Sequence, residues 1–199
     1  RDEDLSEHAA RLVDKAMQDS GEAAKIGTRI HDIIDNWALG RPLPNSIQLY
    51  GDDVVDASTL LDPVISMLKS FDIRRTEFVT VNSGLGYAGT VDMEAFNSNG
   101  VPGLIDFKTK KTKFGKKIRL SDAHVMQLAA YHASEYAPGL GPEEINWEGQ
   151  WAANIYISTT EPGRVELKIW NSIELALAFD GFSACCGLWR YLKGYDARG

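Results

Sequence analysis

Two short stretches of the chain place charged side chains inside otherwise apolar sequence. Residues 86–96 read GYAGTVDMEAF and residues 101–109 read VPGLIDFKT, so Asp92, Asp106 and Lys108 interrupt runs of apolar residues. Both stretches have the composition of β-strands, and the NSNG sequence between them predicts a hairpin. A charge inside a strand is costly to bury unless it is paired or bound to a metal. The hairpin is therefore the first place to expect chemistry.

Strand alternation adds a geometric prediction to this hairpin. It places Thr90, Asp92 and Glu94 on one face of the first strand, and Asp106 and Lys108 on one face of the second. Two carboxylates and one amine are thereby brought together, which is more typical of a reactive site than of a solvent-facing surface.

A basic run begins at the end of the hairpin. Residues 108–119 read KTKKTKFGKKIR and hold seven of the 21 basic residues and no acid. Such a run is commonly a solvated loop. Beside an acidic site it has a second interpretation, a positive rim for an anionic partner. The net charge of −7 argues against attraction of nucleic acid by the whole surface.

The length and composition predict one globular domain over residues 1–199, with a helical part at 1–72 and a sheet core at 73–199. No apolar run is long enough to span a bilayer, so no membrane association is expected. The chain starts at Arg1 without a recognisable signal peptide, and we expect a protein that is not secreted.

Cys185 and Cys186 are adjacent, which favours core-facing thiols in a reducing compartment. Two cysteines are too few for an iron–sulfur cluster.

Periodicity and turn signals predict alternating groups of helices and strands. A Ser20-Gly21 break separates the first two helices, and the last helix is expected to close the core. The order predicts an α/β (α+β) fold with a central mixed five-stranded sheet flanked by helices. The expected helices are 5–19, 22–39, 57–70, 120–136 and 172–192, and the expected strands are 73–81, 86–96, 101–109, 150–158 and 164–170.

Four further polar residues are candidates for the site. His31 lies at the flank of an apolar helical stripe, one turn from Gly27, and is either a structural histidine or a ligand-facing one. Glu77 points either toward the core side of its strand or to water. Gln127 and Tyr131 are four residues apart on a helix, so they stack on one face, which is either a solvent face or part of a site.

The full set of these motifs resembles the PD-(D/E)XK nuclease superfamily, and within it the RecB-like exonuclease branch. The resemblance covers about residues 25–136, and GYAGTVD is also similar to the corresponding phrase of mitochondrial genome-maintenance and phage exonucleases. Val91 stands where the superfamily name has Pro. The motifs that carry the resemblance are His31, Gly89-Thr90-Val91-Asp92, Asp106-Phe107-Lys108-Thr109 and Gln127-x-x-x-Tyr131.

The resemblance implies a restriction-endonuclease-like core and a DNA exonuclease that depends on Mg²⁺ or Mn²⁺ and acts in recombination, repair or replication. Lys108 would orient or deprotonate the attacking water, Glu77 would hold a metal-bound water, and Gln127 and Tyr131 would position Lys108 or the nucleic-acid backbone. The implied metal ligands are His31, Asp92, Asp106 and the carbonyl of Phe107. The residues expected to grip flanking phosphates are Thr109, Lys110, Lys111, Lys113, Lys116, Lys117 and Arg119.

The expected partner is DNA that is single-stranded or has free ends, in the cytoplasm of a bacterium, in a phage-infected cell or in an organelle matrix. The sequence leaves homo-oligomerisation open. A non-catalytic nucleic-acid-binding module of the same fold and a site-specific endonuclease are the alternative functions.

Overall fold

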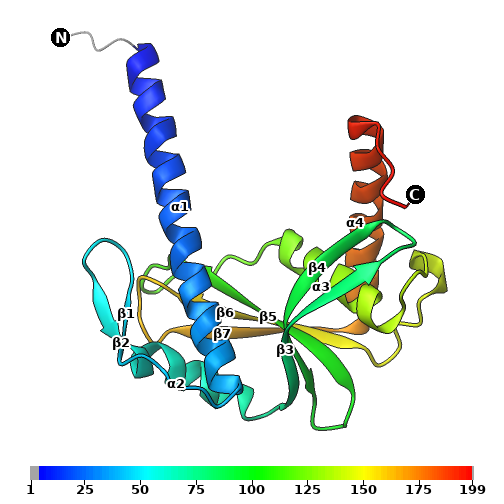
Figure 1. Ribbon diagram of the computed structural model, residues 1–199, viewed down its shortest axis with the longest axis horizontal. Coiled ribbons are helices and arrows are strands. Elements are labelled where there is room, and N and C mark those ends of the chain that lie inside the picture. Colours follow the sequence, from blue (N-terminus) through cyan, green and yellow to red (C-terminus); the bar gives the residue numbers. More distant parts are fainter. Residues whose placement is uncertain (1–4, 199) are drawn as a thin grey trace.

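The computed structural model describes residues 5–198, which form a sheet flanked by helices (Figure 1). A small two-stranded sheet, β1 with β2, precedes the main one. The helices are α1 (Leu5–Ala38), α2 (Ala57–Leu68), α3 (Asp122–Tyr136) and α4 (Ser172–Lys193), with a 3₁₀ turn at Pro142–Glu144. The strands are β1 (Ser46–Gln48), β2 (Val54–Asp56), β3 (Asp72–Asn82), β4 (Tyr87–Phe96), β5 (Pro102–Lys110), β6 (Trp151–Ser158) and β7 (Val165–Trp170).

The main sheet has five strands in the order β3-β4-β5-β6-β7. All neighbours are antiparallel except β5 and β6, which run parallel because α3 makes the crossover between them. The predicted class is thus confirmed at the level of an α+β fold with a mixed five-stranded sheet between helices, and the predicted hairpin forms from β4 and β5.

Apolar residues cover both faces of this sheet and divide the core in two. Ile105 and Phe107 of β5 pack with α1 and α2 on one face, whereas Leu104 packs with α3 and α4 on the other. A strand buried on both faces needs apolar side chains at nearly every position, which explains the near-continuous apolar character of β5 and β6. A polar residue in either strand is therefore conspicuous.

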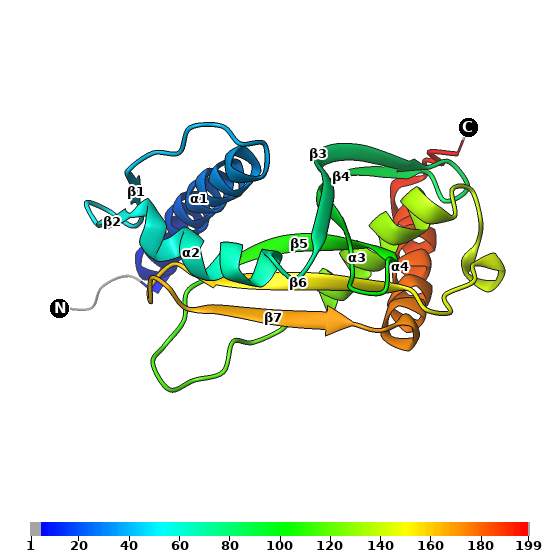
Figure 2. The same ribbon diagram turned by 90° about the horizontal axis from the view of Figure 1, so that it is seen from below.

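The two central strands separate part-way along their length. β4 pairs with β5 only from Met93, opposite Ile105, to Phe96. Before Met93, β4 stays paired with β3 and follows it away from β5, while β5 remains paired with β6 as far as Lys110 (Figure 2). This separation opens a wedge in the sheet next to Asp92.

Two sequence predictions about the first 60 residues were wrong. The expected break at Ser20-Gly21 is absent, and α1 continues through it. A glycine inside a helix costs about 1 kcal/mol relative to alanine, and the good helix formers on both sides outweigh that cost. The segment 41–56, in which no helix or strand was expected, contains the β1–β2 hairpin, which is too short to give a periodic signal.

The last helix packs less completely than predicted. Leu175 and Phe179 are buried under α3, but Leu177, Leu188 and Tyr191 are exposed, and the C-terminal part of α4 extends beyond the sheet (Figure 1). Within residues 5–198, α4 is long and apolar enough to cross a membrane by length and composition, a test that core helices also pass. Cys185 is exposed and Cys186 partly buried, so the prediction of core-facing thiols was wrong for the first.

Candidate active site

Three side chains from three elements converge at the wedge. His31 of α1, Glu77 of β3 and Asp92 of β4 each place one potential ligand atom within 4.8 Å of the others. The His31 Nδ1 and Asp92 Oδ2 atoms are 3.4 Å apart. These residues open onto a pocket of about 400 Å³ between α1 and the sheet. The pocket is lined by Gly27, Thr28, His31, Asp32, Glu77, Asp92, Phe107, Lys108 and Thr109.

The backbone at Glu77 is strained. Its φ is +46°, and among residues 5–198 it is the non-glycine residue with a positive φ. Left-handed backbone costs an L-residue about 1–3 kcal/mol and concentrates at functional sites. Glu77 lies between Thr76, which pairs with Met93, and Phe78, which pairs with Val91, so it sits opposite Asp92. The side chain is exposed rather than core-facing, and it lines the pocket.

The Asp92 carboxylate replaces a strand contact. Its Oδ2 accepts a hydrogen bond of 2.8 Å from the backbone N–H of Phe107. This N–H lies beyond the last β4–β5 pair, so the side chain bridges the gap where the strands diverge. The same oxygen faces His31, and Asp92 is thereby fixed on both sides of the wedge.

A chain of hydrogen bonds occupies the opposite, α3-facing side. Lys108 Nζ donates to Asp106 Oδ1 and to Gln127 Oε1, both at 2.8 Å, and Gln127 Nε2 donates to the Tyr131 hydroxyl at 2.8 Å. The predicted shared face of Asp106 and Lys108 and the predicted stacking of Gln127 on Tyr131 are confirmed. The structure therefore brings Lys108, Gln127 and Tyr131 together as one connected unit.

Asp106 is not part of the His31 cluster. Its side chain is 3% exposed, and its carboxylate is held by Lys108 and by Asn154. Asn154 Nδ2 donates to Asp106 Oδ2 at 2.8 Å, and Asn154 Oδ1 accepts from Trp170 Nε1 at 2.8 Å. Sequence reasoning missed Asn154, although a signal existed: it is the amide in the buried strand WAANIYIS, directly opposite Asp106 in the register.

The charges of the site shift one another's protonation. Burial of the His31 ring opposes protonation, but the hydrogen bond to Asp92 and the charge of Asp92 leave the pKa of His31 raised. Burial, with the charge of Asp92 added, raises the pKa of Asp106 to about 6, against the opposing effect of Lys108. Partial burial and Asp92 also raise the pKa of Glu77. The charge of Asp92 is thus a shared cause of the raised pKa of Asp106 and of Glu77.

Two glycines allow the helices to approach the strands. A Cβ built on Gly89 would lie 2.4 Å from Cε1 of Tyr131, so only glycine lets α3 place this tyrosine against β4. A Cβ on Gly27 would lie 3.2 Å from Oγ1 of Thr109, so Gly27 keeps α1 close to β5. Gly89 thus lets Tyr131 and Gln127 of α3 approach Lys108, and Gly27 lets His31 of α1 approach Asp92.

The predicted common face of Asp92 and Glu94 was wrong. Glu94 turns toward α3, where it accepts hydrogen bonds from Tyr136 and Arg75, both at 2.7 Å, whereas Asp92 meets His31 of α1. Val91 packs in the core under α3 whereas Met93 packs in the core under α1, so the regular alternation of β4 is interrupted at Asp92. Glu94 is a structural tie between the sheet and α3.

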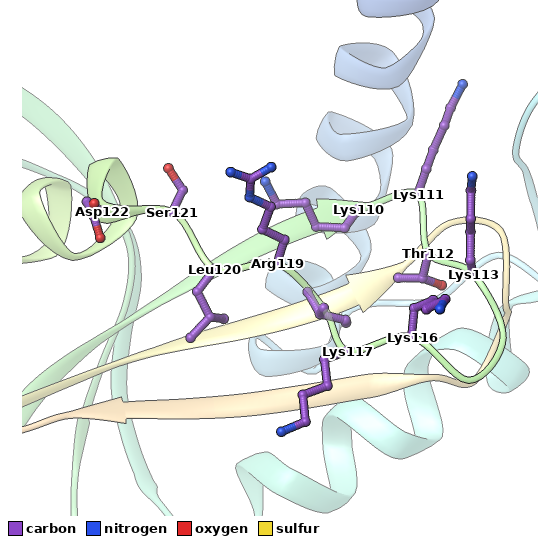
Figure 3. Close-up of a pocket in the computed structure, with 11 residues that line it drawn as sticks. Lys110, Lys111, Thr112, Lys113, Lys116, Lys117, Arg119, Leu120, Ser121 and Asp122 are labelled. Carbon is purple, nitrogen blue, oxygen red and sulfur yellow. The ribbon is translucent and has the colours of Figure 1, made fainter.

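The basic run forms a second hollow, beyond the end of β5. Its volume is about 580 Å³. The Lys110, Lys111 and Lys113 side chains extend to one side of the loop, whereas Lys117 points to the other (Figure 3). Thr109 lines the pocket at His31, Glu77 and Asp92 and does not line this hollow. The lining residues are Lys110, Lys111, Thr112, Lys113, Lys116, Lys117, Ile118, Arg119, Leu120, Ser121 and Asp122.

No protein-family model matches this chain, and no curated protein matches it. One solved structure with a match is titled "Crystal structure of SSO0001". It is 21% identical, the match covers 65% of this chain and 61% of that protein, and the TM-score is 0.33. The chain thus spans less than two thirds of that protein, and a likeness at this TM-score supports no inference about fold or function.

Proposed function

We propose that this protein is a metal-dependent DNA exonuclease built on a restriction-endonuclease-like core. The observation that supports this proposal is the wedge itself. A His-Glu-Asp cluster with ligand atoms within 4.8 Å of one another faces an open pocket, and the Asp106–Lys108–Gln127 chain lies immediately beside it. Acids, an imidazole and a fixed ammonium around one cavity fit phosphodiester hydrolysis better than simple binding of an anion.

The donor set fits a divalent cation. The carboxylates of Glu77 and Asp92 suit Mg²⁺ or Mn²⁺, and the His31 imidazole favours Mn²⁺ of the two. Asp106 and the carbonyl of Phe107 remain proposed additional ligands. The charge of Asp92 is among the causes that raise the pKa of Asp106, so a cation near both would relieve their repulsion. Such a cation supplies charge neutralisation at the phosphate when it is bound.

Lys108 is suited to orient a reactant. An ammonium has three N–H donors, and two of those of Lys108 are used on Asp106 and Gln127. The third is left to donate to an attacking water or to a phosphate oxygen. Because Asp106 is held by Asn154 and Gln127 by Tyr131, the ammonium is fixed before substrate binds, which lowers the cost of reaching the reactive geometry.

The basic loop supports DNA as the substrate of the proposed nuclease. In this proposal the lysines at 110–117 and Arg119 contact phosphates flanking the scissile one and set the register of the strand. A non-catalytic DNA-binding module of the same fold stays the alternative. The buried carboxylate of Asp106 argues against it, because a module that only binds a polyanion has no need of a buried acid.

The test uses end-labelled single- and double-stranded DNA with Mg²⁺ or Mn²⁺, labelled at either end. We expect stepwise release of nucleotides that stops in EDTA and in Asp92→Asn and Lys108→Met. Asp62→Asn, an exposed acid on α2, is the matched control and should be fully active. Circular single strands separate the two nuclease types, since only an endonuclease cuts them. Full activity of both site variants, or binding without cleavage under all conditions, would refute the proposal.

A further inference from the structure

The basic loop carries a fully exposed aromatic residue at its tip. Phe114 is 95% exposed. It occupies the second position of a tight turn in which Lys116 N–H donates to the Lys113 carbonyl at 3.0 Å. Gly115, at the third position, has a φ of +71°, as a type II turn requires. The turn geometry thus projects the ring outward, away from the hydrophobic core.

Hydrogen bonds from the Arg164 side chain fix this turn to the body of the protein. Arg164, just before β7, donates to the carbonyl oxygens of Lys113, at 3.2 Å, and Lys116. The guanidinium is held by Glu161 at 2.7 Å and Glu166 at 2.8 Å. The loop therefore presents Phe114 on a backbone that is ordered before any partner arrives, so little conformational entropy is left to lose on binding.

The surroundings of the ring define the chemistry of its partner. Lys113 and Lys116 flank the turn and Lys117 follows it, and no acid occurs between Lys108 and Arg119. A rigid aromatic face among cations matches a polymer with a π-face and an anion in each repeat, which is a nucleic-acid strand with unpaired bases. A duplex offers its phosphates but not its base faces, because these are stacked on one another.

We propose that Phe114 is a stacking platform for an unpaired base, and that it makes the basic loop a single-strand-binding element. This inference adds a preference for single strands to the proposed function. It rests on that function for the assumption that the bound strand is the substrate. The lysines grip the backbone of any strand, whereas Phe114 adds affinity only when a base is accessible. The loop thereby favours single-stranded DNA, or a single-stranded end, over a closed duplex.

The experiment measures binding in EDTA by fluorescence anisotropy, so that cleavage plays no part. The probes are a labelled single-stranded oligonucleotide, the same length with abasic sites throughout, and the corresponding duplex. We expect Phe114→Ala to weaken binding of the base-bearing single strand roughly tenfold, and to change binding of the abasic strand and the duplex less than about twofold. Phe114→Trp should restore binding of the base-bearing strand.

Two controls separate stacking from charge and from general effects. Lys116→Ala/Lys117→Ala should weaken binding of all three probes, because it removes phosphate contacts. Tyr191→Ala removes an aromatic side chain that is 83% exposed on α4, outside the loop, and should leave all three affinities unchanged. Thermal unfolding of each variant verifies that the fold is intact.

The outcomes distinguish this inference from the proposed function. Equal binding of Phe114→Ala and the wild type, an equal loss on the abasic strand, or no binding of single-stranded DNA by the wild type overturns the stacking role, even where the protein cleaves DNA. Selective loss on the base-bearing strand supports the stacking role, even where no cleavage occurs with any metal.

Discussion

The carboxylate of Asp92 takes the place of a strand partner for the backbone N–H of Phe107, which donates to it at 2.8 Å. One side chain thus has two functions: it satisfies a backbone donor where β4 leaves β5, and it presents a charge to the pocket. Removing the side chain affects folding and chemistry together, whereas an isosteric amide separates them.

Asp92→Asn should therefore keep the fold and lose the activity. The amide oxygen still accepts the Phe107 N–H, so we expect an unfolding free energy close to that of the wild type without metal. The negative charge is gone, and we expect Mn²⁺-dependent DNA cleavage to fall more than about 100-fold. Asp92→Ala should lose both, with a further cost of about 1–3 kcal/mol for the unpaired N–H. Urea unfolding and cleavage rates measured on the same samples check both effects.

Asn154 lies under the site and should matter for activity without touching the substrate. Asn154→Leu removes one of the two partners of Asp106 Oδ2, which keeps Lys108, and leaves the buried Trp170 Nε1 donor unpaired, so we expect a loss of stability of about 1–3 kcal/mol for the donor alone. Asp106, which holds the Lys108 ammonium, is then oriented less firmly, and cleavage per folded molecule should fall about 10- to 100-fold.

Ile155→Val is the matched control for this prediction. Ile155 lies on the same strand as Asn154, in the core that faces α1 and α2. The substitution should cost about 0.5–1.5 kcal/mol of stability and leave cleavage per folded molecule unchanged. Equal effects of the two substitutions on cleavage would show that Asn154 acts through stability alone.

The sequence predicted most of the main sheet, because its strands are buried and give clear apolar runs. It also predicted that Asp106 and Lys108 share a face and that Gln127 stacks on Tyr131, since both relations depend on local periodicity. What it could not predict depends on long-range geometry. The separation of β4 from β5 decides that Asp92 turns to His31 and not to the side of Asp106.

Glu77 and Asn154 are two further residues whose roles could not be predicted from the sequence. Sequence reasoning left the direction of Glu77 open, because a left-handed backbone inside a strand has no signature in a glutamate. Asn154 was passed over because its partners, Asp106 and Trp170, come from neighbouring strands. A polar residue in a strand buried on both faces is the clue that could have found it.

Glu77 should show opposite effects on stability and function. Glu77→Gly removes both the carboxylate and the left-handed strain, so the metal-free protein should gain about 1 kcal/mol of stability. Glu77→Gln keeps the strain and should leave stability nearly unchanged. Both variants should lose Mn²⁺ affinity, measured by calorimetry, and cleavage activity. A glycine variant no more stable than the glutamine variant would contradict the claim that the backbone at this position is strained.

The stability of the protein should fall in mild acid because of His132 on α3. Its side chain is 1% exposed, and burial lowers its pKa from 6.5 to about 4. Above pH 6.5 the ring is neutral in the folded and unfolded states, and it has no effect on the pH dependence. As the pH falls from 6.5 to 4 only the unfolded state gains the proton, so the unfolding free energy should drop by roughly 3 kcal/mol through this residue.

His132→Leu should remove that part of the acid sensitivity, measured as urea-unfolding free energies between pH 4 and 8. Leu128→Ala, a core substitution on the same helix, provides the comparison, because it should lower the free energy by about 2–5 kcal/mol at every pH and leave the slope intact. A leucine variant that retains the wild-type slope between pH 6.5 and 4 would assign the acid sensitivity to other groups. A flattened slope identifies the buried imidazole of His132 on α3 as its source.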